Sequence, residues 1–220
     1  MTRKLNSDRK GAPLGQAKSA VIFVHGYGAD GADLLGLADP LGPHLPDTAF
    51  YSPNAPEKCP ANPFGYQWFP IPWLDGSSEA AALAGLQASA ADLNAFVDEV
   101  LACEGLAPEA LALVGFSQGT MLSLQIAPRR PAPLAGLVGF SGRLMQPEKL
   151  AAEAVSHLPV LLVHGDSDDV VPPASLSEAA DALTAAGFET YAHLSKGTAH
   201  GIAHDGLSLA LSFLREKLPG

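Results

Sequence analysis

The chain has 220 residues, 47% of them hydrophobic, and a formal net charge of −10 at pH 7. This length fits one domain with a substantial core, and the dispersed 22 Gly and 19 Pro exclude a collagen-like or low-complexity chain. The acidic balance argues against nucleic-acid binding and against docking on anionic lipid, because neutralising phosphates requires clustered Lys and Arg.

The cysteines and the N-terminus indicate the compartment. Cys59 and Cys103 form neither a C-x-x-C pair nor a zinc-like array, which favours two unpaired thiols in a reducing compartment. The first apolar run, residues 20–24, is too short for a signal peptide (about 7–15 residues) or a membrane span (~20). We therefore expect a cytoplasmic protein without stable membrane insertion. A flexible, basic and polar arm over residues 1–18 should precede a single domain over residues 19–220.

Short apolar runs alternate with longer amphipathic stretches. Strands are predicted over residues 20–24, 48–52, 111–114, 134–140, 160–163 and 189–194, and helices over residues 79–104, 118–127, 147–155, 175–186 and 206–217. Residues 54–78 are predicted to be a loop because prolines recur there. Runs such as V-L-L-V are typical of parallel strands covered on both faces. The prediction is an α/β fold with a mostly parallel, doubly wound sheet and helices on both faces. Ligands of such folds bind beyond the carboxyl ends of the strands.

A serine motif stands between a predicted strand and a predicted helix. Gly115-Phe116-Ser117-Gln118-Gly119 matches G-x-S-x-G in the strand–turn–helix context that makes this motif informative. On so sharp a turn, side chains two residues before and after the serine would collide, so glycine is wanted at both positions. Ser117 is therefore the predicted nucleophile.

A second serine stands in a similar setting. In Gly139-Phe140-Ser141-Gly142-Arg143 the second glycine is replaced by Arg143, and Pro147 follows soon after. We assign Ser141 a structural role in a loop at the edge of the site.

A serine nucleophile needs an imidazole as base and a carboxylate that fixes its tautomer, in the chain order Ser, Asp or Glu, His in α/β-hydrolases. Residues 164–172 (H-G-D-S-D-D-V-V-P) follow a strand and offer three acids. Asp166 is expected to tie the turn, Asp168 to reach a neighbouring loop, and Asp169 to be solvated; we favour Asp168 as the orienting acid.

Three histidines follow as candidate bases. His193 falls within a predicted strand and is expected to be packed. His200 stands in G-T-A-H-G, between that strand and the last helix, and is favoured as the base. His204 has i, i+4 spacing to it but no H-E-x-x-H pattern, so a metal site is not predicted.

Acyl transfer also needs two backbone amides aimed at the developing oxyanion. Gln118 should supply one. The Gly-rich loop after the first strand, His25-Gly26-Tyr27-Gly28, should supply the other through Tyr27. This loop lacks both G-x-G-x-x-G and the G-K-[ST] ending, so a nucleotide site is not predicted.

Taken together, H-G-Y-G-A-D-G, G-F-S-Q-G, H-G-D-S-D-x-V-V-P and A-H-G-I resemble the phospholipase/carboxylesterase family, from about residue 20 to the end. This family includes bacterial carboxylesterases and acyl-protein thioesterases. The resemblance implies a small α/β-hydrolase with a triad of Ser117, Asp168 and His200, oxyanion amides at Tyr27 and Gln118, and no metal or other cofactor. The sequence departs from the family pattern at Tyr27, usually Leu, at Thr120, usually Gly, and at Arg143, usually aromatic or small. Arg143 argues against a purely apolar acyl pocket.

The most aromatic stretch, residues 64–73, is the candidate substrate wall. Its alternative is a surface loop that tucks its rings into the core. The predicted acyl-side residues are Trp68, Phe69, Leu144, Met145 and Val170. No insertion is long enough for a large cap domain, so a shallow, open site for short or medium acyl chains is expected.

The predicted function is a serine carboxylesterase acting on a small-molecule ester through an acyl-enzyme. Acyl-protein thioesterase or lysophospholipase activity on the same triad is the alternative. A non-catalytic ligand-binding relative is less favoured because all three proposed triad members are present. The oligomeric state is left open, with a homodimer as one alternative.

Overall fold

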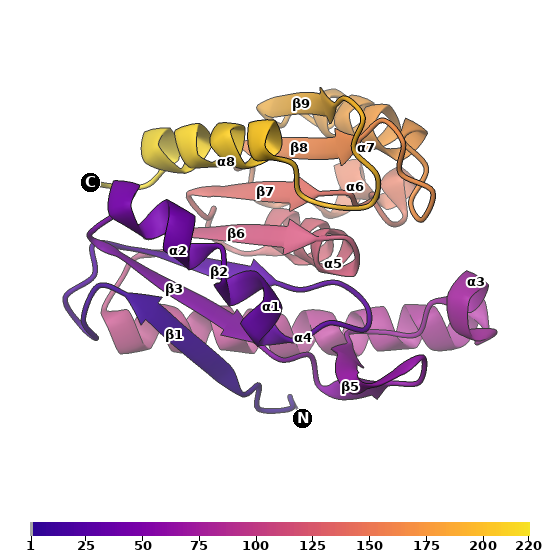
Figure 1. Ribbon diagram of the computed structural model, residues 1–220, viewed down its shortest axis with the longest axis horizontal. Helices are drawn as coiled ribbons and strands as arrows, with labels where there is room; N and C mark the ends of the chain where they lie inside the picture. Colours follow the sequence, from indigo (N-terminus) through magenta and orange to yellow (C-terminus); the bar gives the residue numbers. More distant parts are fainter. Residues whose placement is uncertain (1) are drawn as a thin grey trace.

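The computed structural model describes residues 2–220 and contains a seven-stranded sheet of order β1-β3-β2-β6-β7-β8-β9, with a separate pair β4-β5 (Figure 1). The strands are β1 (Ser7–Gly11), β2 (Ser19–Val24), β3 (Thr48–Pro53), β4 (Glu57–Cys59), β5 (Asn62–Gln67), β6 (Leu111–Phe116), β7 (Gly136–Phe140), β8 (Val160–Gly165) and β9 (Thr190–Ser195). The helices are α1 (Gly31–Leu35), α2 (Ala38–Leu41), α3 (Pro72–Asp75), α4 (Glu79–Glu104), α5 (Gln118–Ile126), α6 (Pro147–Glu153), α7 (Ala174–Ala185) and α8 (His204–Lys217). Short 3₁₀ turns cover Gly42–His44, Pro108–Ala110 and Ala127–Arg129.

Six of the seven strands in the main sheet run parallel, and only β1 is antiparallel to its neighbour β3. The carboxyl ends of the parallel strands therefore meet at one edge, on the right of Figure 1. The predicted α/β class and doubly wound sheet are confirmed. Each strand predicted from the sequence exists, with bounds that differ by one or two residues.

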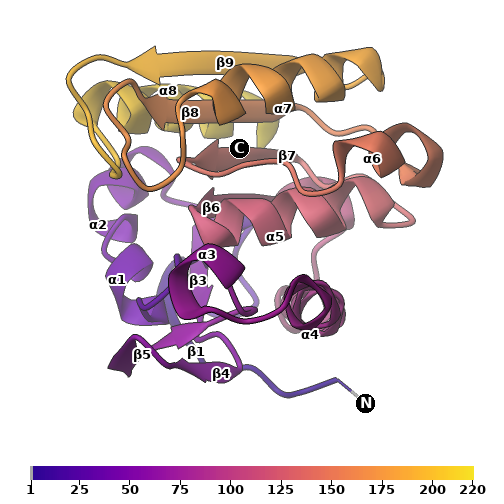
Figure 2. The same ribbon diagram turned by 90° about the vertical axis from the view of Figure 1, so that its right-hand side faces the viewer.

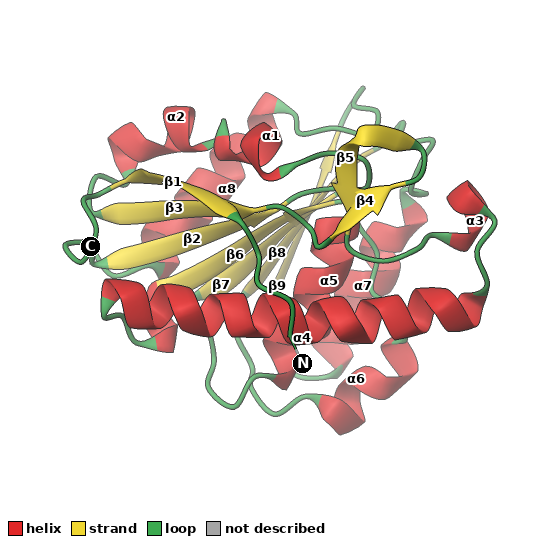
Figure 3. Cartoon of the chain, turned by 90° about the horizontal axis from the view of Figure 1, so that it is seen from below, coloured by secondary structure: helices red, strands yellow, loops and turns green. Residues whose placement is uncertain are grey.

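Helices cover both faces of this sheet. Helices α1, α2 and α8 lie on one face, and α4, α5, α6 and α7 on the other (Figure 3). The side chains of β2 alternate between the two resulting cores: Ile22 and Val24 pack with α4 and α5, whereas Val21 and Phe23 pack with α1, α2 and α8. Burial on both faces explains why the central strands have continuous apolar runs.

The longest helix, α4, has the bounds predicted from its spacing, Glu79–Glu104. Ser78 caps its first turn by accepting the Ala81 amide, and Gly105 ends it with a left-handed φ of 67°. No helix among residues 2–220 is long and apolar enough to cross a membrane.

The loop predicted over residues 54–78 contains more structure than expected. Strands β4 and β5 form a small hairpin and α3 adds one turn, all beside the carboxyl ends of the main strands (Figure 2). The hairpin bonds to the loop after β2: the Gly28 amide donates to Tyr66 at 2.9 Å, and the Tyr66 amide donates to Ala29 at 2.8 Å. The prolines kept this segment out of the main sheet but not out of a separate hairpin.

The prediction of a flexible arm is wrong for the part that forms β1, which pairs with β3 along its whole length. Leu5 is buried, and Arg9 forms an ion pair at 2.7 Å with the buried carboxylate of Glu104. Although burial opposes ionisation, hydrogen bonds from Tyr51, the Gly15 amide and Arg9 lower the pKa of Glu104. Strand β1 has no buried apolar residue of its own, so its backbone pairing with β3 and the ion pair of Arg9 keep it at the edge of the sheet. Met1 lies outside the described residues.

Candidate active site

The Ser117 turn has the strained geometry that its motif predicts. Ser117 has φ 53° and ψ −114° between β6 and α5, in a region that non-glycine residues rarely occupy. A Cβ at Gly115 would lie 2.6 Å from the Thr120 nitrogen, and one at Gly119 would overlap the Val24 carbonyl. The Ser117 amide donates to the Phe140 carbonyl at 2.8 Å. Close approach to β2 and α5 thus requires both glycines and holds Ser117 at the sheet edge.

Asp168 and His200 come together from different loops. The Nδ1 atom of His200, after β9, lies 2.7 Å from Oδ2 of Asp168, after β8. With Nδ1–H donating to the carboxylate, Nε2 is left as the proton acceptor, which is the tautomer required of a general base. Asp168 is the only one of the three competing acids that bonds to this histidine.

The Asp168 carboxylate is fully enclosed by donors. Its Oδ1 accepts the amides of Val170 and Val171, each at 2.9 Å, and its Oδ2 also faces Nε2 of His164 at 3.2 Å. Burial would raise the pKa of Asp168, but the hydrogen bonds from His200, Val171 and Val170 outweigh it and lower that pKa. The carboxylate is therefore ionised at neutral pH. His164 was not assigned a role from the sequence; its position at the end of β8, next to Gly165, was the available signal.

The imidazole of His200 lies beside the Ser117 turn. Its ring packs on Phe116, the residue before Ser117, with ring centroids 4.9 Å apart. Within the described residues, the Ser117 hydroxyl and His200 do not form a hydrogen bond. Catalytic bonds of this kind are often long without substrate and tighten in the complex.

The competing residues lie elsewhere. Asp166 accepts the Gly197 amide at 2.8 Å and so ties the β8 loop to the loop that carries His200. Asp169 is exposed, as expected. His193 is not packed as predicted: it is partly exposed and pairs with Asp205 at 2.7 Å. His204 is exposed in the first turn of α8.

The two amides predicted to bind an oxyanion lie in the loop after β2 and at the start of α5. Neither the Tyr27 nor the Gln118 amide has a hydrogen-bond partner within residues 2–220. Gln118 is the first residue of α5, where the helix leaves amides unpaired and favours negative charge. Both predicted oxyanion donors are thus available to a substrate oxygen. Burial raises the pKa of the Tyr27 hydroxyl.

A buried histidine fixes the loop that carries Tyr27. The Nδ1 atom of His25 lies 2.7 Å from the Gly26 carbonyl oxygen, and its Nε2 accepts the Ala55 amide at 3.0 Å. His25 must then be the neutral Nδ1–H tautomer, in agreement with burial, which lowers its pKa. No role was predicted for His25, although the H-G pair at the end of β2 was a signal for it.

The residues predicted for the acyl side divide into two groups. Trp68 and Phe69 are only 0% and 2% exposed, so the structure corrects their assignment: the alternative, rings tucked into the core, holds for both. The Trp68 indole donates to the His25 carbonyl at 3.0 Å, and the Gln118 side chain bonds to the backbone of both aromatic residues. Trp68 and Phe69 therefore support the loop after β2 and the first residue of α5, next to Ser117.

The other three predicted acyl-side residues differ in exposure. Val170 is 42% exposed, Met145 is partly buried, and Leu144 is buried. Val170 borders an open hollow of about 260 Å³ together with Trp73, Arg143, Val171 and Pro172. This hollow adjoins Asp168 through Val170 and Val171.

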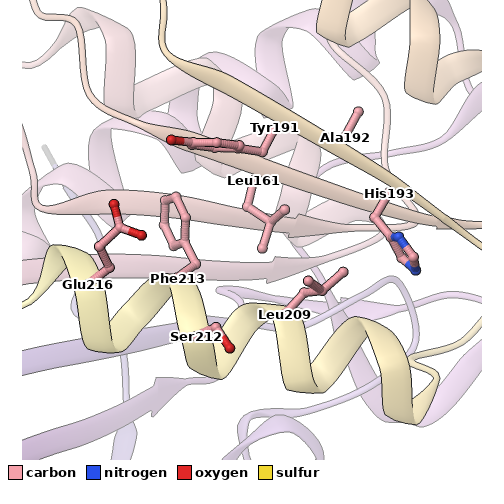
Figure 4. A pocket seen from close by; sticks show the side chains of 8 residues that line it. All are labelled: Leu161, Tyr191, Ala192, His193, Leu209, Ser212, Phe213 and Glu216. Carbon is pink, nitrogen blue, oxygen red and sulfur yellow. The ribbon is translucent and has the colours of Figure 1, made fainter.

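A different hollow of about 320 Å³ lies between β9 and α8 (Figure 4). It is lined by Leu161, Tyr191, Ala192, His193, Leu209, Ser212, Phe213 and Glu216. Because Leu161 stands near the beginning of β8, opposite the end that leads to Asp168, this hollow is separate from the candidate active site.

The helix-covered parallel sheet and the strained serine turn define an α/β-hydrolase. A family model described as Phospholipase/Carboxylesterase matches residues 11–218, and the chain belongs to this family. Acyl-protein thioesterase 1 of Kluyveromyces lactis is 30% identical over 230 residues, covering 97% of this chain and 98% of the relative. Esterase YpfH of Escherichia coli is 25% identical over 211 residues, which cover 94% of this chain and 87% of the length of that esterase.

The solved structure of esterase PE8 superimposes with a TM-score of 0.93 at 46% identity, covering 98% of this chain and all of that one. The resemblance inferred from the motifs is thereby confirmed. The protein is an enzyme of the serine hydrolase class, in a family of carboxylesterases and acyl-protein thioesterases.

Proposed function

We propose that this protein is a serine carboxylesterase that hydrolyses short- to medium-chain esters through Ser117, Asp168 and His200. One arrangement carries the proposal: His200 bonds to Asp168 at 2.7 Å while its ring packs against Phe116, next to the strained Ser117. The two unpaired amides of Tyr27 and Gln118 supply a place for a developing oxyanion.

In the proposed reaction, the Ser117 oxygen attacks the ester carbonyl carbon as its proton passes to Nε2 of His200. The carbonyl oxygen becomes an oxyanion that accepts from the Tyr27 and Gln118 amides. The carbon–oxygen bond to the alcohol then breaks, and His200 returns its proton to the departing alkoxide. Water repeats the sequence on the acyl-enzyme and releases the acid, with Asp168 holding the imidazole throughout.

Openness of the site favours small substrates. The hollow beside Asp168 is bordered by exposed side chains, since Trp73 and Val170 are about half exposed. We expect an open hollow of about 260 Å³ to cover only part of a long acyl chain, and binding affinity from apolar contact scales with the area removed from water. We therefore expect kcat/KM to be greatest for short or medium acyl chains.

Thioester hydrolysis is the second candidate, and the relatives supply its support. The Kluyveromyces lactis acyl-protein thioesterase is similar to this chain over almost its whole length. A thioester would use the same nucleophile, base and oxyanion amides. Lysophospholipid hydrolysis needs the same groups with a different alcohol part.

A substrate panel tests the proposal. Initial rates on p-nitrophenyl esters of two to sixteen carbons, on an S-acylated peptide and on a lysophospholipid should be greatest for the short esters. A maximum at the longest chains, or a higher kcat/KM for the S-acylated peptide, would reject the carboxylesterase proposal in favour of the second candidate.

The expected setting of this activity is a reducing compartment, which we take to be the cytoplasm. Cys59 is buried and Cys103 is exposed, and both are free thiols, as predicted. The expected partner is a small-molecule ester.

A further inference from the structure

The hollow beside Asp168 has a cationic wall. Of the five residues that border it, Trp73, Val170, Val171 and Pro172 are apolar, and Arg143 is the charged member. The hollow has a volume of about 260 Å³, large enough for a chain of several heavy atoms. Its composition is apolar with one charge, which is typical of sites that orient a ligand by a single polar group.

Arg143 has no carboxylate partner within residues 2–220, although the protein is acidic. Arg3, Arg9, Arg129 and Arg130 each form an ion pair of 2.6–2.8 Å with Asp or Glu. Arg143 is exposed, and its guanidinium lies 5.5 Å from the centroid of the Trp73 ring. A cation over an aromatic face keeps its N–H donors free while its position is restricted. The guanidinium of Arg143 thus offers the hollow N–H donors that have no carboxylate partner among the described residues and whose position is restricted by Trp73.

The backbone of Arg143 is fixed next to the nucleophile. Gly142, the residue before it, lies so close to Ser117 that an added Cβ would be 3.0 Å from the Ser117 carbonyl oxygen. The Ser141 amide donates to Val163 at 2.8 Å, which anchors this loop to the end of β8. The loop after β7 therefore carries Arg143 to one side of the hollow, and the loop after β8 carries Val170 and Val171 to the other.

We propose that Arg143 is a specificity-determining residue, and that the preferred substrates are esters bearing a carboxylate several bonds from the scissile carbonyl. The apolar wall would contact the intervening methylene groups, and the guanidinium would bind the carboxylate through paired N–H donors, the geometry that arginine matches best. This inference rests on the proposed esterase function, because it concerns the substrate of that same site.

The test compares charged and neutral esters by titrating the acid released. The comparison of monomethyl adipate with methyl hexanoate tests a carboxylate on the acyl side of the ester. The acetyl ester of γ-hydroxybutyrate against butyl acetate places it on the alcohol side. The wild type should prefer the charged member of at least one pair in kcat/KM, and the preference should fall with added salt because this charge is exposed.

In Arg143→Gln the charged-to-neutral ratio for that pair should fall about tenfold or more, and Arg143→Lys should retain part of it. Arg215→Gln is the matched control, since it removes another exposed arginine without an ion pair among the described residues, on α8, and should leave the ratio unchanged. A ratio that is the same in the wild type and Arg143→Gln, or that Arg215→Gln lowers equally, overturns the inference. Failure of the esterase proposal itself is recognised separately, because the wild type would then hydrolyse neither member of either pair.

Discussion

The Nδ1 atom of His25 binds the carbonyl oxygen of Gly26 at 2.7 Å, in the same peptide unit that carries the Tyr27 amide. A trans peptide is planar, so its N–H points away from its C=O. Holding the Gly26 oxygen on one side therefore directs the Tyr27 amide to the other. His25 acts on the proposed oxyanion site through this one peptide, and it is a positioning residue.

The His25→Leu substitution should lower kcat for a short ester by about 10²–10³-fold, the effect of losing one oxyanion donor, with a smaller change in KM. His25→Asn can still donate to Gly26 from near the Nδ1 position and should retain more of kcat. Steady-state kinetics on variants whose circular dichroism matches the wild type checks this. Equal kcat values in all three proteins would contradict the positioning role.

Replacing Asp168 should affect both activity and acid stability. Asp168→Asn should lower kcat by about 10³–10⁴-fold, because an amide does not hold the imidazole in the required tautomer. The folded pKa of Asp168 lies below its unfolded value near ~3.9, so its stabilisation is complete above that pH and is lost as the pH falls through the folded value. Urea midpoints of wild type and Asp168→Asn should therefore differ by a constant amount from pH 7 to pH 5 and converge below about pH 4. A gap that widens on acidification would contradict this assignment.

Trp68 should matter for stability rather than for choice of acyl chain. Trp68→Phe removes the indole donor to the His25 carbonyl and leaves a small cavity, which we expect to cost about 1–3 kcal/mol of unfolding free energy. The chain length with the highest kcat/KM should not change. Val170→Ala, at the exposed border of the hollow, is the comparison and should change the relative rates on longer chains. A shift of the optimum in Trp68→Phe instead would restore Trp68 as a substrate contact.

The edge strand β1 should depend on one ion pair. Arg9→Gln leaves the buried Glu104 carboxylate without its cation and should lower the unfolding free energy by about 2 kcal/mol. Lys10→Gln, in the same strand, breaks only an exposed pair with Asp39 and should cost less than about 0.5 kcal/mol. Urea denaturation of both variants is the measurement. Equal losses of unfolding free energy in the two variants would show that the buried Glu104 carboxylate is not stabilised by Arg9.

Much of the fold could be predicted from the sequence because its signals are local. The buried strands are continuous apolar runs, and Ser117, Asp168 and His200 each follow the end of a strand, where a parallel sheet collects its functional loops. The need for Gly115 and Gly119 could also be predicted, because side chains at these two positions of the serine turn would collide with the neighbouring backbone.

The remaining features depend on contacts between distant residues. Residues 7–11 have a polar sequence, and they form a strand through backbone pairing with β3 and through the contacts of Arg9 with Tyr51 and Glu104, far along the chain. Trp68 and Phe69 are apolar aromatic residues, and such residues suit a substrate wall and a core equally well. The ring of His25 is also anchored by the amide of Ala55, 30 residues further along the chain, a contact that the H-G pair alone does not reveal.

The central claim, that Ser117 is the nucleophile, is tested most directly by labelling with a fluorophosphonate probe and locating the adduct by peptide mass spectrometry. Ser141→Ala is the matched control, since Ser141 is also buried with a positive φ after the neighbouring strand. The wild type and Ser141→Ala should both be labelled at Ser117, and Ser117→Ala should not react. Labelling that persists in Ser117→Ala, or that disappears in Ser141→Ala, would contradict the account.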